Sequence, residues 1–228
     1  MTRDPNRIYI GLVLKSGDTR WETSMSLIQQ AVSQLPGHSF VIKPGGGCDV
    51  AHARNLMLHD WHDHTDCGRL VWLDSDVIWL PDDFRRLVAW QVPYVAGLYP
   101  LKGLGCQWSF NGPGEESRLT PGLWNVAEVC TGFTSMTHDL HVRLRHAYSG
   151  MSYTIEDHAF RGETGHEICA MGPVMGRRLP EDFMLSRRVH NVGCEVNVDP
   201  TILVGHVGAV NLLEMPRRLG SFKAPTLE

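Results

Sequence analysis

The chain has 228 residues, 43% of them hydrophobic and 20% charged, and 21 basic and 25 acidic side chains give a formal net charge of -4. These values are typical of a globular protein with a sizeable core, and they exclude disordered, collagen-like and coiled-coil chains. The charge is too balanced to indicate a nucleic-acid or membrane partner by itself. No apolar run approaches the roughly 20 residues that span a bilayer, so we expect no membrane association.

The first 102 residues alternate between strand-like and helix-like patterns. We expect strands at Ile8–Leu14, Ser39–Ile42, Arg69–Asp74 and Val92–Tyr99, helices at Trp21–Leu35, Val50–Trp61 and from Pro81, and a loop at Pro44–Gly47. Apolar residues at helical spacing indicate the helices, and near-continuous apolar runs indicate the strands. We expect Asp49 to be the N-cap of the helix at Val50–Trp61. The order predicts a single α/β domain with a mostly parallel central sheet and helices on both faces.

The second half of the chain is less regular. We expect a loop or hairpin over Gly103–Leu123, a glycine-rich irregular stretch over Ser149–Arg178 and a tail from about residue 211. Between them lie predicted strands at Val126–Phe133 and Glu195–Val204 and predicted helices at Thr137–Tyr148 and Pro180–Val189. The chain thus divides into a regular half, residues 1–102, and a less regular half, residues 103–210. Long irregular stretches are often functional.

The segment with the clearest chemistry is Asp74-Ser75-Asp76, which directly follows a buried strand. Residues i and i+2 of an extended segment point to one side, and the carboxyl ends of parallel strands are where open α/β sheets bind ligands. Two such carboxylates repel each other, and a divalent cation that bridges to phosphates relieves the repulsion. An ordinary turn with two aspartates is the competing interpretation.

Three other features have weaker signals when taken singly. Arg54 lies in the helix before that strand, Glu181 and Asp182 begin a later helix, and His206 lies between glycines after an apolar strand. Each has a plain structural explanation: a solvated helix face, acids favoured by a helix N-terminus, and a structural histidine.

Taken in order, these motifs resemble those of metal-dependent glycosyltransferases of the GT-A fold, over roughly residues 7 to 210. The matching pieces are Asp74-Ser75-Asp76, Thr131-Gly132-Phe133, Pro180-Glu181-Asp182 and His206. The resemblance implies a nucleotide-sugar donor of the UDP type and Mn²⁺ or Mg²⁺ as cofactor. It also implies that residues 1–102 are the nucleotide-sugar-binding half and residues 103–210 the acceptor-binding and catalytic half.

The resemblance also implies a role for each matching residue. Asp76, Asp74 and His206 would bind the metal, and Asp182 would be the catalytic base with Glu181 beside it. The donor would contact a set of residues near the first strand and the motifs: Leu14, Lys15, Ser16, Arg54, Asp74, Ser75 and Gly132. Lys102 would face the acceptor.

Small enzymes of this type occur in phages, where some transfer sugars to hydroxymethylated pyrimidines in DNA. Hydroxymethylpyrimidine in phage DNA is therefore the leading acceptor, and a polysaccharide precursor or a protein is the alternative. The pairs Arg177-Arg178, Arg187-Arg188 and Arg217-Arg218 and the stretch His141–His146 offer phosphate contacts. The six scattered cysteines include no C-x-x-C pair and predict free thiols, so we expect a cytoplasmic protein, in the host cytoplasm if phage-encoded.

Two other functions and one other metal site remain as alternatives. A sugar nucleotidyltransferase also uses paired acids and a metal, although Lys15-Ser16-Gly17-Asp18 is a poor version of its glycine-rich basic loop. A non-catalytic sugar-binding protein would keep the fold without needing both Asp76 and His206. The histidine-rich segment His59–His64 has many metal-ligating side chains, but the end of a surface helix is the favoured interpretation.

Overall fold

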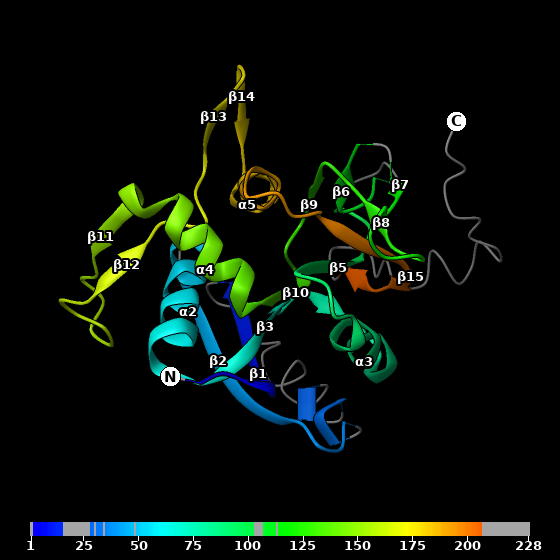
Figure 1. Cartoon of the computed structure of the whole chain (residues 1–228), viewed down its shortest axis with the longest axis horizontal. Coiled ribbons are helices and arrows are strands. Elements are labelled where there is room, and N and C mark those ends of the chain that lie inside the picture. Colours follow the sequence, from blue (N-terminus) through cyan, green and yellow to red (C-terminus); the bar gives the residue numbers. More distant parts are fainter. Residues whose placement is uncertain are drawn as a thin grey trace.

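The computed structural model describes residues 2–15, 28–29, 31–33, 35–47, 49–102, 107–112 and 114–206. An eight-stranded sheet runs through the molecule in the order β2-β1-β3-β10-β5-β15-β8-β7 (Figure 1). Among the helices of this described part, none is long and apolar enough to cross a membrane.

The strands of this sheet differ in length and in direction. Their bounds are β1 Asp4–Lys15, β2 Ser39–Gly47, β3 Cys67–Asp74, β5 Tyr94–Leu98, β7 Glu115–Glu116, β8 Trp124–Asn125, β10 Phe133–Thr137 and β15 Asn197–Leu203. The β2–β1, β1–β3 and β5–β15 pairs are parallel, whereas β10 lies antiparallel between β3 and β5. The α/β class is confirmed, and the sheet is mixed rather than mostly parallel.

The connection between β5 and β10 explains the mixed sheet. A parallel return requires a crossover of a dozen or more residues, usually a helix. The described part of this connection contains only the short strands β6 (Phe110–Asn111), β7, β8 and β9 (Glu128–Val129). The chain therefore re-enters the sheet in the opposite direction.

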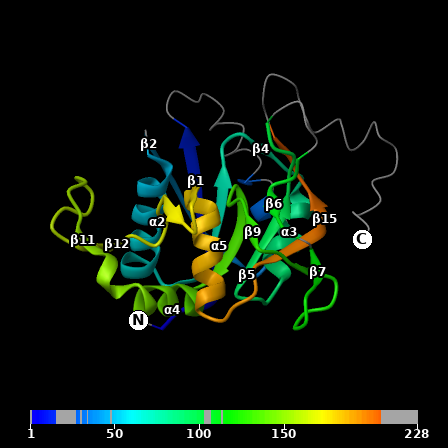
Figure 2. The same ribbon diagram turned by 90° about the horizontal axis from the view of Figure 1, so that it is seen from above.

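Helices cover both faces of the sheet, as the alternating side chains of β1 require. Ile8, Ile10 and Leu12 belong to one core cluster, and Tyr9 and Val13 belong to the other. The face with Tyr9 and Val13 packs against α2 (Val50–His64), α4 (His138–Ala147) and α5 (Glu181–Asn191). The face with Ile8, Ile10 and Leu12 packs against α3 (Pro81–Ala89). Figure 2 shows α2, α4 and α5 on one side of the sheet, with α3 behind it.

Four smaller two-stranded pairings lie outside the main sheet. They are β11 (Ser152–Thr154) with β12 (Thr164–His166), β13 (Gly172–Val174) with β14 (Arg177–Leu179), β4 (Val77–Ile78) with β16 (Gly205–His206), and β6 with β9. A 3-10 turn, η1 at Ser149–Met151, precedes β11. Two of these hairpins therefore occupy the stretch for which the sequence predicted no regular structure.

Two sequence predictions are wrong in detail. The predicted loop Pro44–Gly47 continues β2, which among the described strands pairs with β1 alone and lies at the sheet edge, so the missing N–H of Pro44 is tolerated there. The strand predicted at Val126–Phe133 instead spans Phe133–Thr137, where polar Ser135 accepts a hydrogen bond from buried Arg69 at 2.8 Å. Of the predicted helix at 21–35, residues 28–29 and 31–33 are helical, and most others lie outside the described residues.

Candidate functional site

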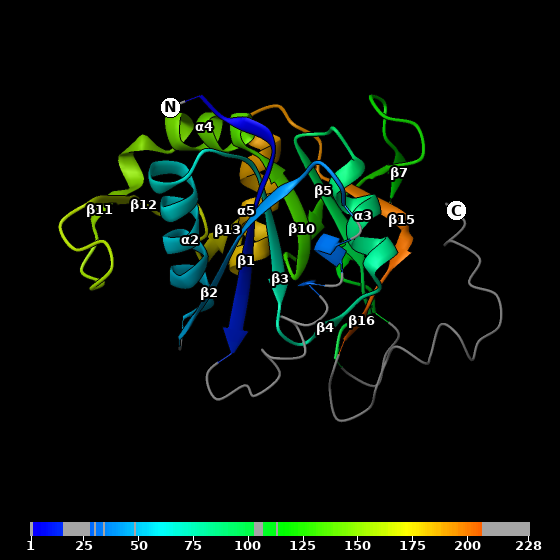
Figure 3. The same ribbon diagram turned by 90° about the horizontal axis from the view of Figure 1, so that it is seen from below.

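The polar residues singled out by the sequence gather where β1 and β3 end. The backbone N–H of Asp74 donates to Gly132 O at 2.9 Å, and the N–H of Ser75 donates to Val13 O at 3.0 Å. Figure 3 shows β1 and β3 ending on the same edge of the molecule, close to β4 and β16. The motif that follows β3 is thereby fixed to both neighbouring strands.

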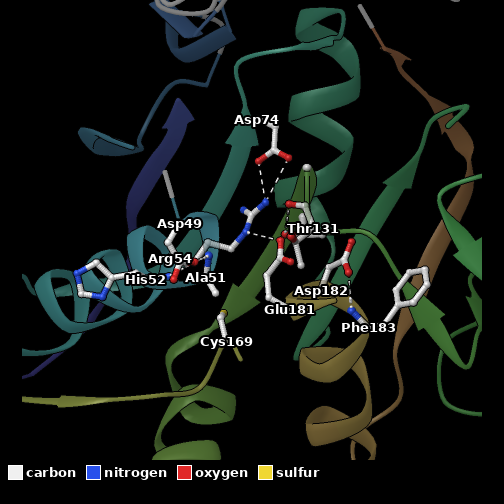
Figure 4. A network of polar contacts seen from close by, with 12 residues as sticks. Asp49, Ala51, His52, Arg54, Asp74, Thr131, Cys169, Glu181, Asp182 and Phe183 are labelled. Carbon is white, nitrogen blue, oxygen red and sulfur yellow. Dashed lines mark hydrogen bonds and ion pairs between the residues drawn. The ribbon is translucent and has the colours of Figure 1, made fainter. Parts of the chain in front are cut away.

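One end of the site is organised around Arg54 on α2 (Figure 4). Its Nη2 donates to both carboxylate oxygens of Asp74, at 2.9 and 3.2 Å, and its Nε lies 3.8 Å from Glu181 Oε1. The side chain is 2% exposed and packs over the Trp72 ring, with 5.4 Å from Cζ to the ring centroid. Burial alone would lower the pKa of Arg54, but Asp74 and Glu181 keep it above its ordinary value.

Two donors of the Arg54 guanidinium are not used within the described residues. Nε and Nη1 are buried and have no hydrogen-bond partner there. The arginine thus links the motif after β3 to the first turn of α5.

Asp182 follows Glu181 and has a different environment. Burial, and then the charge of Glu181, raise the pKa of Asp182 to about 6. Its Oδ1 accepts the backbone N–H of Phe183 at 2.8 Å, and the Cys130 thiol also hydrogen-bonds to it. A carboxyl that titrates near neutrality is suited to accept and return a proton.

Asp76 lies at the other end of the site. The prediction that Asp74 and Asp76 extend to one side does not hold, because Ser75 and Asp76 form a turn. Lys102 Nζ forms an ion pair with Asp76, and His206 Nε2 lies 3.5 Å from Asp76 Oδ2. Burial opposes ionisation of Asp76, but His206 and Lys102 hold its pKa well below the ordinary range.

His206 is oriented as a metal ligand needs to be. Its Nδ1 lies 3.1 Å from Pro100 O, so the carbonyl accepts the Nδ1–H and Nε2 is the ring nitrogen that faces Asp76. A carboxylate oxygen and an imidazole nitrogen at this separation fit Mn²⁺ or Mg²⁺ that is also bound to phosphate. Pairing of β16 with β4 places His206 opposite Val77, one residue beyond Asp76.

Tyr99 connects the two ends of the site. Its ring lies edge-on to His206, with 5.2 Å between centroids, and its Oη accepts the N–H of Gly132 at 3.1 Å. A Cβ at Gly132 would lie 2.7 Å from Tyr99 Oη and 3.0 Å from Asp74 Oδ2. Only glycine therefore fits here without displacing a neighbour. We use the term edge cluster for Arg54, Asp74, Asp76, Lys102, Glu181, Asp182 and His206.

Some predicted donor contacts are not part of this cluster. The side chain of Leu14 packs partly against the hydrophobic core, and Ser75 is buried. Lys15 ends β1, and Ser16 lies outside the described residues. Sequence reasoning missed Tyr99 and Cys130, whose roles depend on contacts with distant segments.

Most arginines predicted to contact phosphates already have partners in the protein. Arg177 and Arg187 form ion pairs with Glu128, and Arg145 pairs with Asp63. Arg188 is buried and donates to the Ile168 carbonyl oxygen at 2.8 Å. Arg217 and Arg218 lie outside the described residues.

A cavity of about 580 Å³ lies beside the start of α2. Its wall combines α2 with η1, β11 and the segment before Cys169, and includes His52, Asn55, Tyr153 and Glu167. Asn55 fixes this wall, because its amide donates to Cys169 O at 2.7 Å and accepts Cys169 N–H at 2.8 Å. The irregular stretch therefore forms a concave surface on the helix that carries Arg54.

The chain is similar in structure to A197 from STIV, with 17% sequence identity, a TM-score of 0.53, and coverage of 88% of this chain and 85% of that chain. This likeness shows a shared fold. Lower scores come from GalNAc-T7 with UDP, GalNAc and Mn²⁺, at 12% identity, a TM-score of 0.49 and coverage of 90% and 44%. Drosophila β1,4-galactosyltransferase 7 with manganese, UDP-Gal and xylobiose has 12% identity, a TM-score of 0.47 and coverage of 92% and 74%. No protein-family model and no curated protein matches the sequence.

Proposed function

We propose that this chain is a metal-dependent glycosyltransferase that moves a sugar from a nucleotide-sugar donor, of the UDP type, to a hydroxyl acceptor. The observation that carries the proposal is the pairing of Asp76 with His206, whose Nε2 lies 3.5 Å from the carboxylate although 130 residues separate the two in the chain. A fold alone does not require this pairing, whereas a diphosphate-binding cation site does.

The residues of the edge cluster have complementary tasks in this reaction. Asp76 and His206 would bind the cation, and Asp74 and Arg54 would contact the donor. When bound, Mn²⁺ or Mg²⁺ neutralises the negative charge that develops on the leaving nucleoside diphosphate. Gly132 would contact the donor through its backbone, and the missing side chain lets Tyr99 Oη and Asp74 pack beside that backbone.

Asp182 is the proposed general base. Its carboxylate would accept the proton of the acceptor hydroxyl as the oxygen attacks the sugar, and its pKa near 6 keeps it ionised at neutral pH and still basic. Glu181 favours the same role, because its charge helps to raise the pKa of Asp182. The cavity between α2 and β11 is the proposed acceptor site.

The primary test is turnover of several UDP-sugars with and without Mn²⁺ or Mg²⁺. Asp76→Ala and His206→Ala should each abolish metal-stimulated release of UDP, and Asp82→Ala is the matched control because Asp82 is an exposed acid on α3. Unchanged turnover in both site variants would overturn the metal-site assignment. Release of pyrophosphate from a nucleoside triphosphate and a sugar phosphate would instead identify a nucleotidyltransferase.

For the acceptor, we propose hydroxymethylpyrimidine in DNA. The support is the sequence resemblance to small phage enzymes. The test incubates the full chain with hydroxymethylcytosine duplex and labelled UDP-glucose, followed by nucleoside analysis. Label on the modified base supports DNA, whereas turnover with several donors but no label on DNA overturns it and favours a polysaccharide precursor or a protein.

A further inference from the structure

A second group of metal-ligating side chains lies at the far end of α2, away from the N-terminal turns that carry Arg54. His59 and His64 come from α2, and Glu163 comes from the turn that joins β11 to β12. We use the term flank cluster for these three residues. Figures 1 and 2 both show the β11–β12 hairpin beside α2.

The three side chains converge on one point. His59 Nε2 and His64 Nε2 lie 2.9 and 2.8 Å from the same carboxylate oxygen, Glu163 Oε2. One ligand atom from each residue lies within 4.8 Å of the other two. Two imidazoles and one carboxylate are the donor set of many three-ligand zinc sites, in which the fourth position is open.

The surroundings of His59 favour a bound cation over a plain hydrogen-bonded cluster. The His59 side chain is 4% exposed, and its Nδ1 lies 2.9 Å from Asp63 Oδ2. A neutral imidazole has one N–H, so His59 can donate to Asp63 or to Glu163 but not to both. A cation between Nε2 and Glu163 would leave the single N–H on Nδ1, which is buried without a hydrogen-bond partner among the described residues and has Asp63 Oδ2 within reach.

Asp63 is itself held in place. Arg145 on α4 donates to Asp63 Oδ2 at 2.9 Å. A carboxylate that orients a ligating histidine, and is anchored in turn, is the usual outer shell of zinc-binding histidines. Phe160 contacts both rings, with centroids 5.2 Å from His59 and 5.2 Å from His64, and so covers one side of the site.

We propose that the flank cluster binds one Zn²⁺ ion, which fastens the β11–β12 hairpin to helix α2. The inference is independent of the proposed transferase activity, because no residue of the edge cluster contributes. Its role is structural: the hairpin wall of the 580 Å³ cavity contains Tyr153, and the ion fixes the turn at the opposite end of the same hairpin.

The test measures Zn²⁺ binding by calorimetry to the full chain after treatment with a chelator. It is carried out in an Asp76→Asn, His206→Ala background, so that the edge cluster cannot contribute. We expect one Zn²⁺ per chain, and at least a 100-fold loss of affinity in His64→Ala and in Glu163→Gln. Asp63→Asn should weaken binding about 10- to 100-fold. His158→Ala is the matched control, because His158 is exposed on the same hairpin.

Two further measurements keep the outcome unambiguous. Co²⁺ in place of Zn²⁺ should give the intense visible absorption of a tetrahedral site, and that absorption should be absent from the His64→Ala variant. Zn²⁺ should also protect the turn at 155–163 from protease. The proposal is overturned if the background variant takes up no Zn²⁺, or if His64→Ala and Glu163→Gln, with thermal unfolding like that of the parent, still bind it with the same affinity. Either result leaves protonation of His59 as the explanation of its two carboxylate contacts.

Discussion

The edge cluster and the flank cluster both bring histidines and carboxylates together, but their charge balance differs. The edge cluster has four carboxylates, Asp74, Asp76, Glu181 and Asp182, against the two fixed cations Arg54 and Lys102. The flank cluster has one carboxylate shared by two imidazoles. Because the chain leaves the edge cluster with excess negative charge, a cation that arrives with a substrate is favoured there. In the flank cluster, two imidazoles and one carboxylate that converge on one point favour a resident ion.

The comparison implies that the edge cluster serves activity at the expense of stability. The largest expected effect is that of Asp182→Asn, which removes the proposed base and should lower transfer by about 10²- to 10⁴-fold. In the native protein, kcat/KM should rise as the pH increases through about 6, because the ionised carboxylate is the active form. A pH profile of kcat/KM for native protein and variant checks both expectations, and a variant with native activity would show that Asp182 is not the base.

The same substitution should make the protein more stable. The folded state raises the pKa of Asp182 from 3.8 to about 6, so its ionisation disfavours the folded state above that pH. Asp182→Asn should therefore increase the free energy of unfolding by about 2 kcal/mol at pH 8 and have little effect at pH 4. Urea unfolding at the two pH values measures this, and an equal change at both would rule out the ionisation of Asp182 as its cause.

Arg54 is a buried cation of the edge cluster, and its contribution to stability can be compared with that of an exposed arginine. Arg54→Ala should lower the free energy of unfolding by about 3 kcal/mol, because it removes a buried cation from between Asp74 and Glu181. The matched variant Arg85→Ala, of an exposed arginine paired with Asp82, should change stability by less than about 1 kcal/mol. Thermal or urea unfolding tests the difference, and similar losses in both variants would contradict it.

Substitution of Lys102 is expected to have the smallest effect, and that effect should be confined to the Mn²⁺ requirement of the activity. The Lys102 ammonium group is paired with the Asp76 carboxylate, which the metal cation must also bind. Lys102→Gln should lower the Mn²⁺ concentration for half-maximal activity by up to about 5-fold, which corresponds to a partly exposed ion pair of up to about 1 kcal/mol. Zn²⁺ affinity of the flank cluster should not change. A metal titration of activity checks this, and a higher Mn²⁺ requirement would show that Lys102 assists the metal site.

The sequence predicted the elements whose signals are local. The buried strand that ends at Asp74, the Asp49 N-cap that accepts from Ala51 and His52 N–H, and the helix near Pro180 are all present. These features depend on periodicity and on capping within a few residues, so they can be identified without tertiary information.

The features that were missed depend on contacts between distant segments. The polar strand Phe133–Thr137 is stable in the sheet because Arg69 satisfies Ser135, and nothing near Ser135 in the sequence indicates this. Glu163 is 104 residues from His59, so the histidine-rich segment of α2 gave no sign of a third ligand. Lys102, which is predicted to face the acceptor, forms an ion pair with Asp76 that no local pattern indicates.

The double hydrogen bond between Asn55 and Cys169 also has a consequence for how the protein can change. Together with Arg188, which donates to Ile168 O, it holds the chain at a short segment between the β11–β12 and β13–β14 hairpins. Each hairpin therefore has one of its two ends at this anchored segment. Loops with fixed ends accept insertions and replacements readily. Sequence changes within the β11–β12 hairpin that keep Glu163 therefore offer a route to alter the choice of the proposed acceptor while the edge cluster is left intact.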